Sequence, residues 1–116
     1  MNNIDSKINS DIDSIVDYVK NDEDFIRYNA LKKAISNNAH LLLLDKNIHS
    51  LKEKAREEND FKVQEKLLIE ANKLFDEYNS HPLVTNFNFY QKRVEYKCSL
   101  ISNFLKDRMN KETEEK

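Results

Sequence analysis

The sequence predicts an all-α protein, a bundle of about five helices in which a long C-terminal helix follows a turn at Pro82. Apolar residues recur every three or four positions along most of the chain, which is the period of one helix face. Glycine is absent, although the turns of sandwiches and barrels and the phosphate loops of Rossmann folds rely on it. Pro82 is the one proline, and its fixed φ and missing N–H suit the first turn of a helix.

The first helix is expected over residues 4–20. Its apolar residues form one stripe, with the other faces largely acidic: Ile4, Ile8, Ile12, Ile15 and Val19. Asn21 is expected to cap a second helix, with Asp22 and Asp24 in its first turn, where carboxylates interact favourably with the helix dipole. The second helix presents Phe25, Tyr28, Leu31 and Ile35.

A break at residues 36–38 precedes a third helix over residues 39–58. In a chain without glycine, a left-handed residue that ends a helix is expected to be asparagine. The third helix carries a coiled-coil-like seam at Leu41, Leu44, Ile48, Leu51 and Ala55. Residues 57–60 are polar, and they fit either a short loop or an uninterrupted helix.

A fourth helix is predicted over residues 61–78, with one line of residues at Gln64, Leu67, Ala71, Leu74 and Tyr78. The turn that follows has Ser80 or His81 at the N-cap of the last helix, and serine is the stronger capping residue. The last helix is predicted over residues 83–109, a length of about 40 Å. This exceeds what a small domain needs for its own core.

The chain is expected to form a single domain over residues 1–110, with a charged, disordered tail over residues 111–116. The net charge of −2 gives no general attraction to nucleic acid. No apolar run approaches the roughly 20 residues that span a bilayer, so membrane insertion is not expected. No signal peptide is visible, and the single cysteine, Cys98, excludes an internal disulfide. These features predict a cytoplasmic protein.

Charge is unevenly distributed between the two ends of the chain. Residues 4–24 are mainly acidic and residues 92–111 mainly basic. Two interpretations remain open. In the first, the two segments lie near each other or are merely solvated faces. In the second, one of them meets a partner of opposite charge.

No set of residues predicts catalysis, a metal site or a bound cofactor. His40 and His49 are nine positions apart, whereas ligands on one helix face are three or four apart. Cys98 fits a small core residue. The basic residues of the last helix alternate with Tyr96 and Phe104, which are expected to pack against neighbouring helices, so direct nucleic-acid binding is not expected.

The order of these features resembles the YlbF/YmcA family of small helical bacterial regulators. The resemblance covers roughly residues 5–107 and rests on two segments, Asn21-Asp22-Glu23-Asp24-Phe25-Ile26-Arg27-Tyr28 and His81-Pro82-Leu83-Val84. It implies an all-helical fold, self-association and no catalysis. Members act in multi-protein complexes associated with competence, sporulation and biofilm formation. Some are linked to messenger RNA processing through ribonuclease Y, in a complex with a YaaT-type partner.

Some complexes of this kind carry iron–sulfur clusters on cysteines. Here Cys98 stands alone, and a cluster takes four thiolates, so no cofactor is expected unless other chains supply cysteines.

The sequence therefore predicts a non-enzymatic regulator or adaptor that acts through helix-mediated protein contacts, as a homo-oligomer or a heteromer with related helical proteins. The alternative is a structural coiled-coil subunit of a larger assembly, without regulatory output. The candidate contact residues are apolar: Leu41, Leu44, Phe87, Tyr90, Val94, Ile101 and Leu105. The competing interpretation is that these residues form the monomer's own core.

Overall fold

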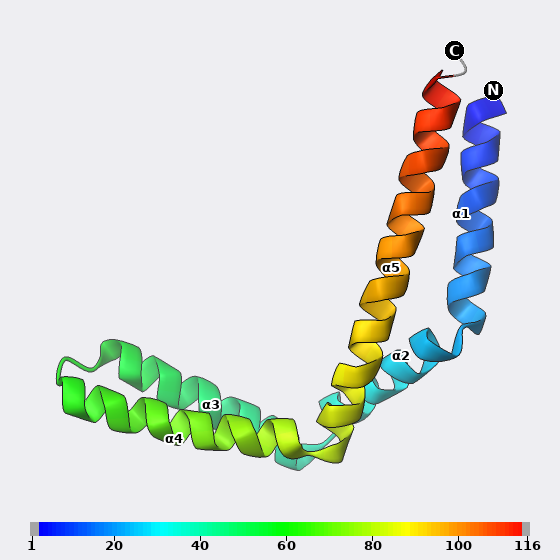
Figure 1. Cartoon of the computed structure of the whole chain (residues 1–116). Coiled ribbons are helices and arrows are strands. Elements are labelled where there is room, and N and C mark those ends of the chain that lie inside the picture. The colour runs from blue at the N-terminus through cyan, green and yellow to red at the C-terminus, as the bar shows by residue number, and fades with distance from the viewer. Residues whose placement is uncertain (1–2, 115–116) are drawn as a thin grey trace. The chain divides into compact units, whose positions relative to one another are not determined.

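The computed structural model describes residues 3–114, with side chains from Ser6 to Lys111. Within these residues the chain forms five helices and no strand (Figure 1). They are α1 (Asn3–Asn21), α2 (Glu23–Ser36), α3 (Ala39–Glu57), α4 (Phe61–Ser80) and α5 (Pro82–Glu114). The predicted all-α fold with a long last helix is confirmed. α5 continues past Lys111, where a disordered tail was expected to begin, and residues 115 and 116 lie outside the described part.

α2 begins at a carboxylate cap. Asp22 Oδ1 accepts hydrogen bonds from the backbone N–H of Asp24 at 2.9 Å and of Phe25 at 3.3 Å. These are donors that the start of a helix leaves without an internal partner. The expectation that Asn21 caps α2 was wrong, because α1 continues through Asn21 and its side chain donates to the Asp17 carbonyl instead.

Side-chain caps also start the next two helices. Asn38 Oδ1 accepts from the N–H of Leu41, and Asp60 Oδ1 accepts from the N–H of Lys62, both at 2.9 Å. Residues 58–60 form a short loop, which settles the alternative left open there. No described residue has a positive φ, so the expected left-handed asparagines are not used. α3 ends instead at Glu58, an extended residue with φ −80° and ψ 129°.

The predicted turn before the last helix is present, with Pro82 as the first residue of α5. His81 is its cap, because its ring Nδ1 accepts from the N–H of Leu83 at 3.1 Å. Ser80, the stronger capping residue by type, is the last residue of α4, and its hydroxyl donates to the Asp76 carbonyl at 2.7 Å. The imidazole therefore takes the role that serine usually plays.

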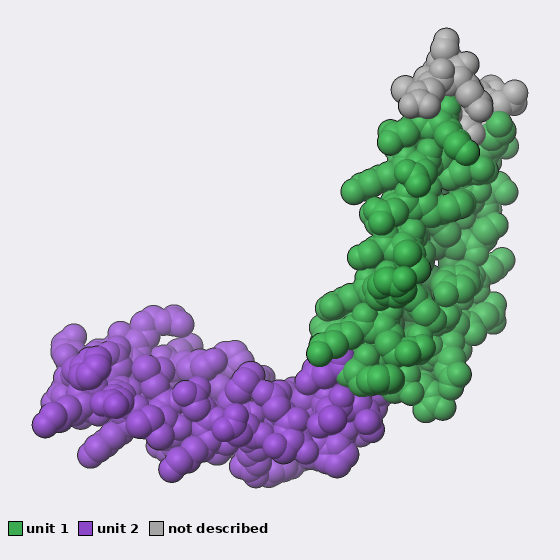
Figure 2. Space-filling view, viewed as in Figure 1, with its two compact units in different colours: residues 1–29, 89–116 green, residues 30–88 purple. Residues whose placement is uncertain are grey.

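The chain divides into two compact units, one formed by residues 1–29 and 89–116 and the other by residues 30–88 (Figure 2). We call them unit 1 and unit 2. The division points fall inside α2 and α5. A single domain over residues 1–110 stays a prediction. The two units share α2 and α5, so the division does not make them separate folding domains.

Unit 2 contains an antiparallel pair of helices, α3 and α4. Leu41, Leu44 and Val84 form its buried cluster, with exposed fractions of 5 % or less. Leu74 and Tyr78 of α4 pack against that cluster. The predicted seam on α3 is therefore filled by the chain's own helices.

Unit 1 contains α1 and the longer part of α5, which run antiparallel (Figure 1). Ion pairs join α5 to the middle of α1 and to the residue that follows α1. Arg108 Nε lies 3.0 Å from Asp11 Oδ2, and Lys97 Nζ lies 2.6 Å from Asp22 Oδ2. Of the two interpretations of the charge asymmetry, the proximity of the acidic and basic segments is confirmed.

Lys97 is the centre of an ion-pair network. Its ammonium also lies 2.7 Å from Asp24 Oδ2, and Arg93 Nε donates to Asp24 Oδ1 at 2.9 Å. Asp24 is buried. A carboxylate is rarely buried unless it has cationic partners, and here Lys97 and Arg93 supply them. Hydrogen bonding to Lys97 lowers the pKa of Asp22 and of Asp24 below their ordinary value of 3.8, and the same contacts raise the pKa of Lys97. The network therefore fixes the start of α2 on α5.

The first prediction concerns the core of unit 2. Leu41→Ala should lower the free energy of unfolding by about 2–5 kcal/mol, because it removes a buried side chain and leaves a cavity. The matched control is Leu43→Ala on the same helix, where the side chain is 56 % exposed and the cost should stay near 0.5 kcal/mol. Urea denaturation followed by circular dichroism measures both. Equal midpoints for the two variants would contradict the burial of Leu41.

The second prediction concerns the network around Lys97. Lys97→Met should lower the melting temperature at pH 7, and its difference from the wild type should shrink as the pH falls through about 4. The folded-state pKa values of Asp22 and Asp24 are lowered. Protons therefore bind the unfolded chain first, and the stabilisation is lost on acidification. Lys97 stays protonated over this pH range, so its own ionisation does not contribute to the pH dependence of stability.

The matched control for this experiment is Lys106→Met, at an exposed position of the same helix. It should show no pH-dependent difference from the wild type. A difference between Lys97→Met and the wild type that stays constant from pH 7 to pH 3 would contradict the ion-pair explanation.

Candidate functional site

One face of α5 presents large apolar side chains to solvent. Phe89, Tyr96, Leu100 and Phe104 are 56 %, 66 %, 50 % and 47 % exposed. Their spacing of seven, four and four residues places them along one side of the helix. Tyr96 and Phe104 were expected to pack against neighbouring helices; Tyr96 is mostly exposed, whereas Phe104 is about half covered. The spacing itself was the signal that could have identified this second stripe.

Three hollows follow one another along this face of unit 1. The first, of about 350 Å³, is lined by Asp24, Lys92, Arg93, Tyr96 and Lys97. The second, of about 180 Å³, is lined by Tyr18, Lys97, Leu100, Ile101 and Phe104. The third, of about 490 Å³, is lined by Phe104, Asp107, Arg108, Asn110 and Lys111.

Neighbouring hollows share a residue, Lys97 between the first two and Phe104 between the last two. We call the three hollows together the α5 groove. From Lys92 to Lys111 it spans about 28 Å at the rise of an α-helix. Aromatic and aliphatic side chains occupy its middle, and cationic side chains stand at both ends.

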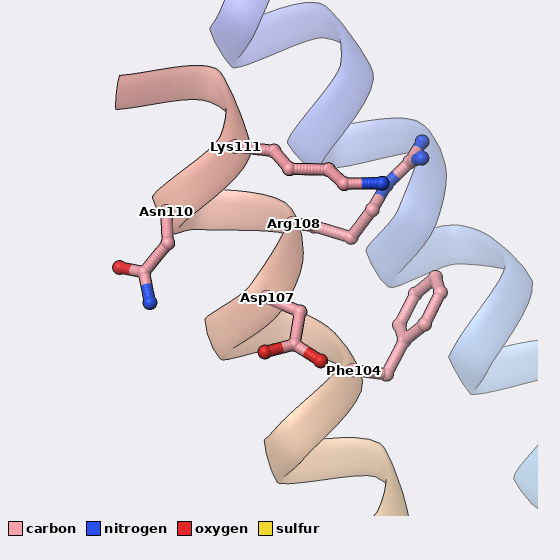
Figure 3. Close-up of a pocket in the computed structure, with 5 residues that line it drawn as sticks. All are labelled: Phe104, Asp107, Arg108, Asn110 and Lys111. Carbon is pink, nitrogen blue, oxygen red and sulfur yellow. The ribbon is translucent and has the colours of Figure 1, made fainter. Parts of the chain in front are cut away.

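Figure 3 shows the end of the groove nearest the C-terminus. The side chains of Phe104, Arg108 and Lys111 extend from α5 towards α1, whereas Asn110 points away from it. The Arg108 guanidinium carbon lies 5.8 Å from the centroid of the Phe104 ring, within cation–π range. This end of the groove is thus bounded by an aromatic ring and two cations.

Most of the positive charge in the groove is already compensated. Arg93, Lys97 and Arg108 lie in ion pairs with carboxylates of α1 and of the start of α2. Lys92 and Lys111 are exposed, and neither has an ion-pair partner among the side chains that the structure describes. The groove therefore has an apolar middle and one uncompensated lysine near each end.

The structure separates the predicted contact residues into two groups. Leu41 and Leu44 are buried in the core of unit 2, so for these two the competing interpretation, the chain's own core, holds. Val94 is buried in unit 1 at 9 % exposure. The others are half-buried: Phe87, Tyr90, Ile101 and Leu105. Of the predicted set, only Ile101 lines the α5 groove.

The residues capable of binding metal are scattered. No group of three or more His, Cys, Asp or Glu side chains lies close enough to hold a metal ion within the described part of the chain. The expectation that Cys98 is a small core residue was wrong, because it is exposed on α5. His40 pairs with Glu77 at 3.4 Å, and His49 pairs with Asp45 on its own helix. Within residues 3–114, no helix combines the length and the apolarity that crossing a bilayer requires.

Comparison with known proteins identifies the family. The model of the family described as control of competence regulator ComK, YlbF/YmcA, matches residues 8–110, which is most of the chain. Searches of curated proteins and of solved structures returned no match. The matched segment includes the Asp22 cap, the Pro82 turn and nearly all of the α5 groove. The chain belongs to the YlbF/YmcA family, whose description links it to the control of competence.

Proposed function

We propose that this protein is a non-enzymatic regulator or adaptor that acts in the cytoplasm through helix-mediated contacts with other proteins, and that the α5 groove is a contact surface. The observation that carries the proposal is the exposed stripe of Tyr96, Leu100 and Phe104, which lines the α5 groove. Contiguous apolar patches of this kind mark interaction sites on soluble proteins. A partner helix can fill such a groove with anchors spaced three, four and seven residues apart.

The charge pattern favours a protein partner over a nucleic acid. A polyphosphate chain needs several uncompensated cations along its path. The groove offers Lys92 and Lys111 at its ends, while Arg93, Lys97 and Arg108 are paired with carboxylates. Asp107 adds a negative charge inside the groove. Tyr96 and Phe104 therefore suit apolar packing better than stacking on bases along a charged strand.

The hypothesis of a regulator is also favoured over the alternative hypothesis of a structural coiled-coil subunit. A coiled-coil subunit would present its heptad seam to another chain. The seam of α3 is instead filled within unit 2. The family supports a regulatory role through its link to competence. By the resemblance, candidate partners are related small helical proteins, a YaaT-type protein and ribonuclease Y. The absence of catalysis and of a cofactor is part of the same proposal.

The third prediction tests the groove as a contact surface. Leu100→Asp should leave the helicity unchanged, because the side chain is half exposed, and should reduce the recovery of partners roughly tenfold or more. The measurement is affinity capture of the tagged full chain from its native cytoplasm, with mass spectrometry of the retained proteins. The matched control is Leu43→Asp, an exposed leucine of α3 that does not line the groove.

Recovery of a ribonuclease or of related helical proteins with the wild type and Leu43→Asp, and their loss with Leu100→Asp, is the expected result. Undiminished recovery with a folded Leu100→Asp variant would show that the groove is not the contact surface.

A further inference from the structure

Unit 2 has a hollow of its own, of about 240 Å³, beside the turn between α4 and α5. The residues that line it come from α2, α4 and the start of α5, and all of them belong to unit 2. None of them lines the α5 groove. A ligand in this hollow is therefore a question separate from the proposed contact surface.

The base of the hollow is apolar and belongs to the core of unit 2. Ile35, Val84 and Phe87 line it. Val84 is 3 % exposed and is part of the buried cluster, and Ile35 packs against that cluster. The Thr85 hydroxyl donates to the Asn79 carbonyl at 3.1 Å, which joins the first turn of α5 to the last turn of α4. The walls are thus held in place by the fold itself.

The polar residues of the hollow have unused hydrogen-bonding groups. The side chains of Lys32, Asn79 and Asn88 line it, and none of them makes a hydrogen bond or an ion pair with another described residue. Lys32 is the one charged residue in the lining, so no carboxylate there balances its ammonium. By contrast, Lys97 of the α5 groove is paired with two carboxylates. The hollow therefore offers one ammonium and two amides beside an apolar base.

The size and chemistry of the hollow define a class of ligand. Ammonium and amide N–H groups are donors that suit the oxygens of a carboxylate, whereas the apolar base favours hydrocarbon. A cavity of about 150 Å³ can hold benzene. The hollow, of about 240 Å³, has room for one ring or branched alkyl group together with a carboxylate.

We infer that this hollow binds a carboxylate joined to a compact apolar group, supplied either as a free acid or as the last residue of a polypeptide. The apolar group lies against Val84 and Phe87, and the carboxylate pairs with Lys32. A head group without negative charge leaves Lys32 without a counter-ion, so the site discriminates by charge as well as by size.

The fourth prediction uses 3-phenylpropanoate as the free acid and acetyl-glycyl-glycyl-phenylalanine as the end of a polypeptide. Binding of either to the ¹⁵N-labelled full chain should shift the amide NMR signals of residues 32–35, 78–79 and 84–88. The dissociation constant should be roughly millimolar, as is usual for ligands with few heavy atoms. The primary amide of each compound should bind roughly tenfold or more weakly, because it lacks the charge-assisted hydrogen bond.

The matched variants are two neighbouring lysines of α2. Lys32→Met should weaken binding of the acids roughly tenfold, because it removes the ammonium and keeps an apolar side chain of similar length. Lys33→Met is the control, since Lys33 is exposed and does not line the hollow. Its affinity should equal that of the wild type. Circular dichroism verifies that both variants keep the helicity of the wild type.

Three results would overturn the inference. The first is the absence of signal changes at these residues with either acid at its highest soluble concentration. The second is equal affinity for an acid and its amide, and the third is undiminished binding to Lys32→Met. Binding of 3-phenylpropanoate alone would support a free acid as the ligand, and binding of the peptide alone would support a polypeptide end. Failure of the inference would leave the α5 groove unaffected, because the two share no residue.

Discussion

Two helices that lie side by side can bury only one stripe of each, and this constraint governs both units of the structure. In unit 2 the stripes of α3 and α4 face each other around Leu41 and Leu44. In unit 1, Val94 is buried, and Ile101 and Leu105 beside it are half-buried. The apolar residues next to these stripes, such as Leu100 and Leu68, have no second layer to cover them. An interaction surface follows directly from this two-helix construction.

Electrostatics then determine what kind of surface remains. The acidic start of the chain and the basic end neutralise each other through Asp11, Asp22 and Asp24. Because these pairs use cations at the walls of the groove, little net charge is left along its middle. A surface rich in lysine and arginine by sequence is therefore nearly balanced in the folded chain. Association through it depends on apolar contact, with charge acting at the ends.

The positions of the helix boundaries could be predicted from the sequence, whereas what each apolar stripe packs against could not. Pro82 marks the start of α5 because its ring restricts φ, and the polar residues near Asn38 mark the break before α3. The periodicity on α3 correctly placed Leu41 and Leu44 on one face. It could not show whether that face meets the same chain or another one. The same limit explains why Tyr96, which lies beside the predicted stripe of α5, was assigned to packing.

The way in which the helices begin determines which substitutions this sequence can tolerate. No described residue needs a left-handed backbone, so a β-carbon is tolerated at every boundary and no glycine has to be preserved. The start of each helix from α2 to α5 depends instead on a single side-chain acceptor, at Asp22, Asn38, Asp60 and His81. Substitution at these positions is constrained by hydrogen-bonding chemistry and hardly by shape. Among distant relatives, breaks between helices can therefore shift by a residue wherever a new acceptor arises.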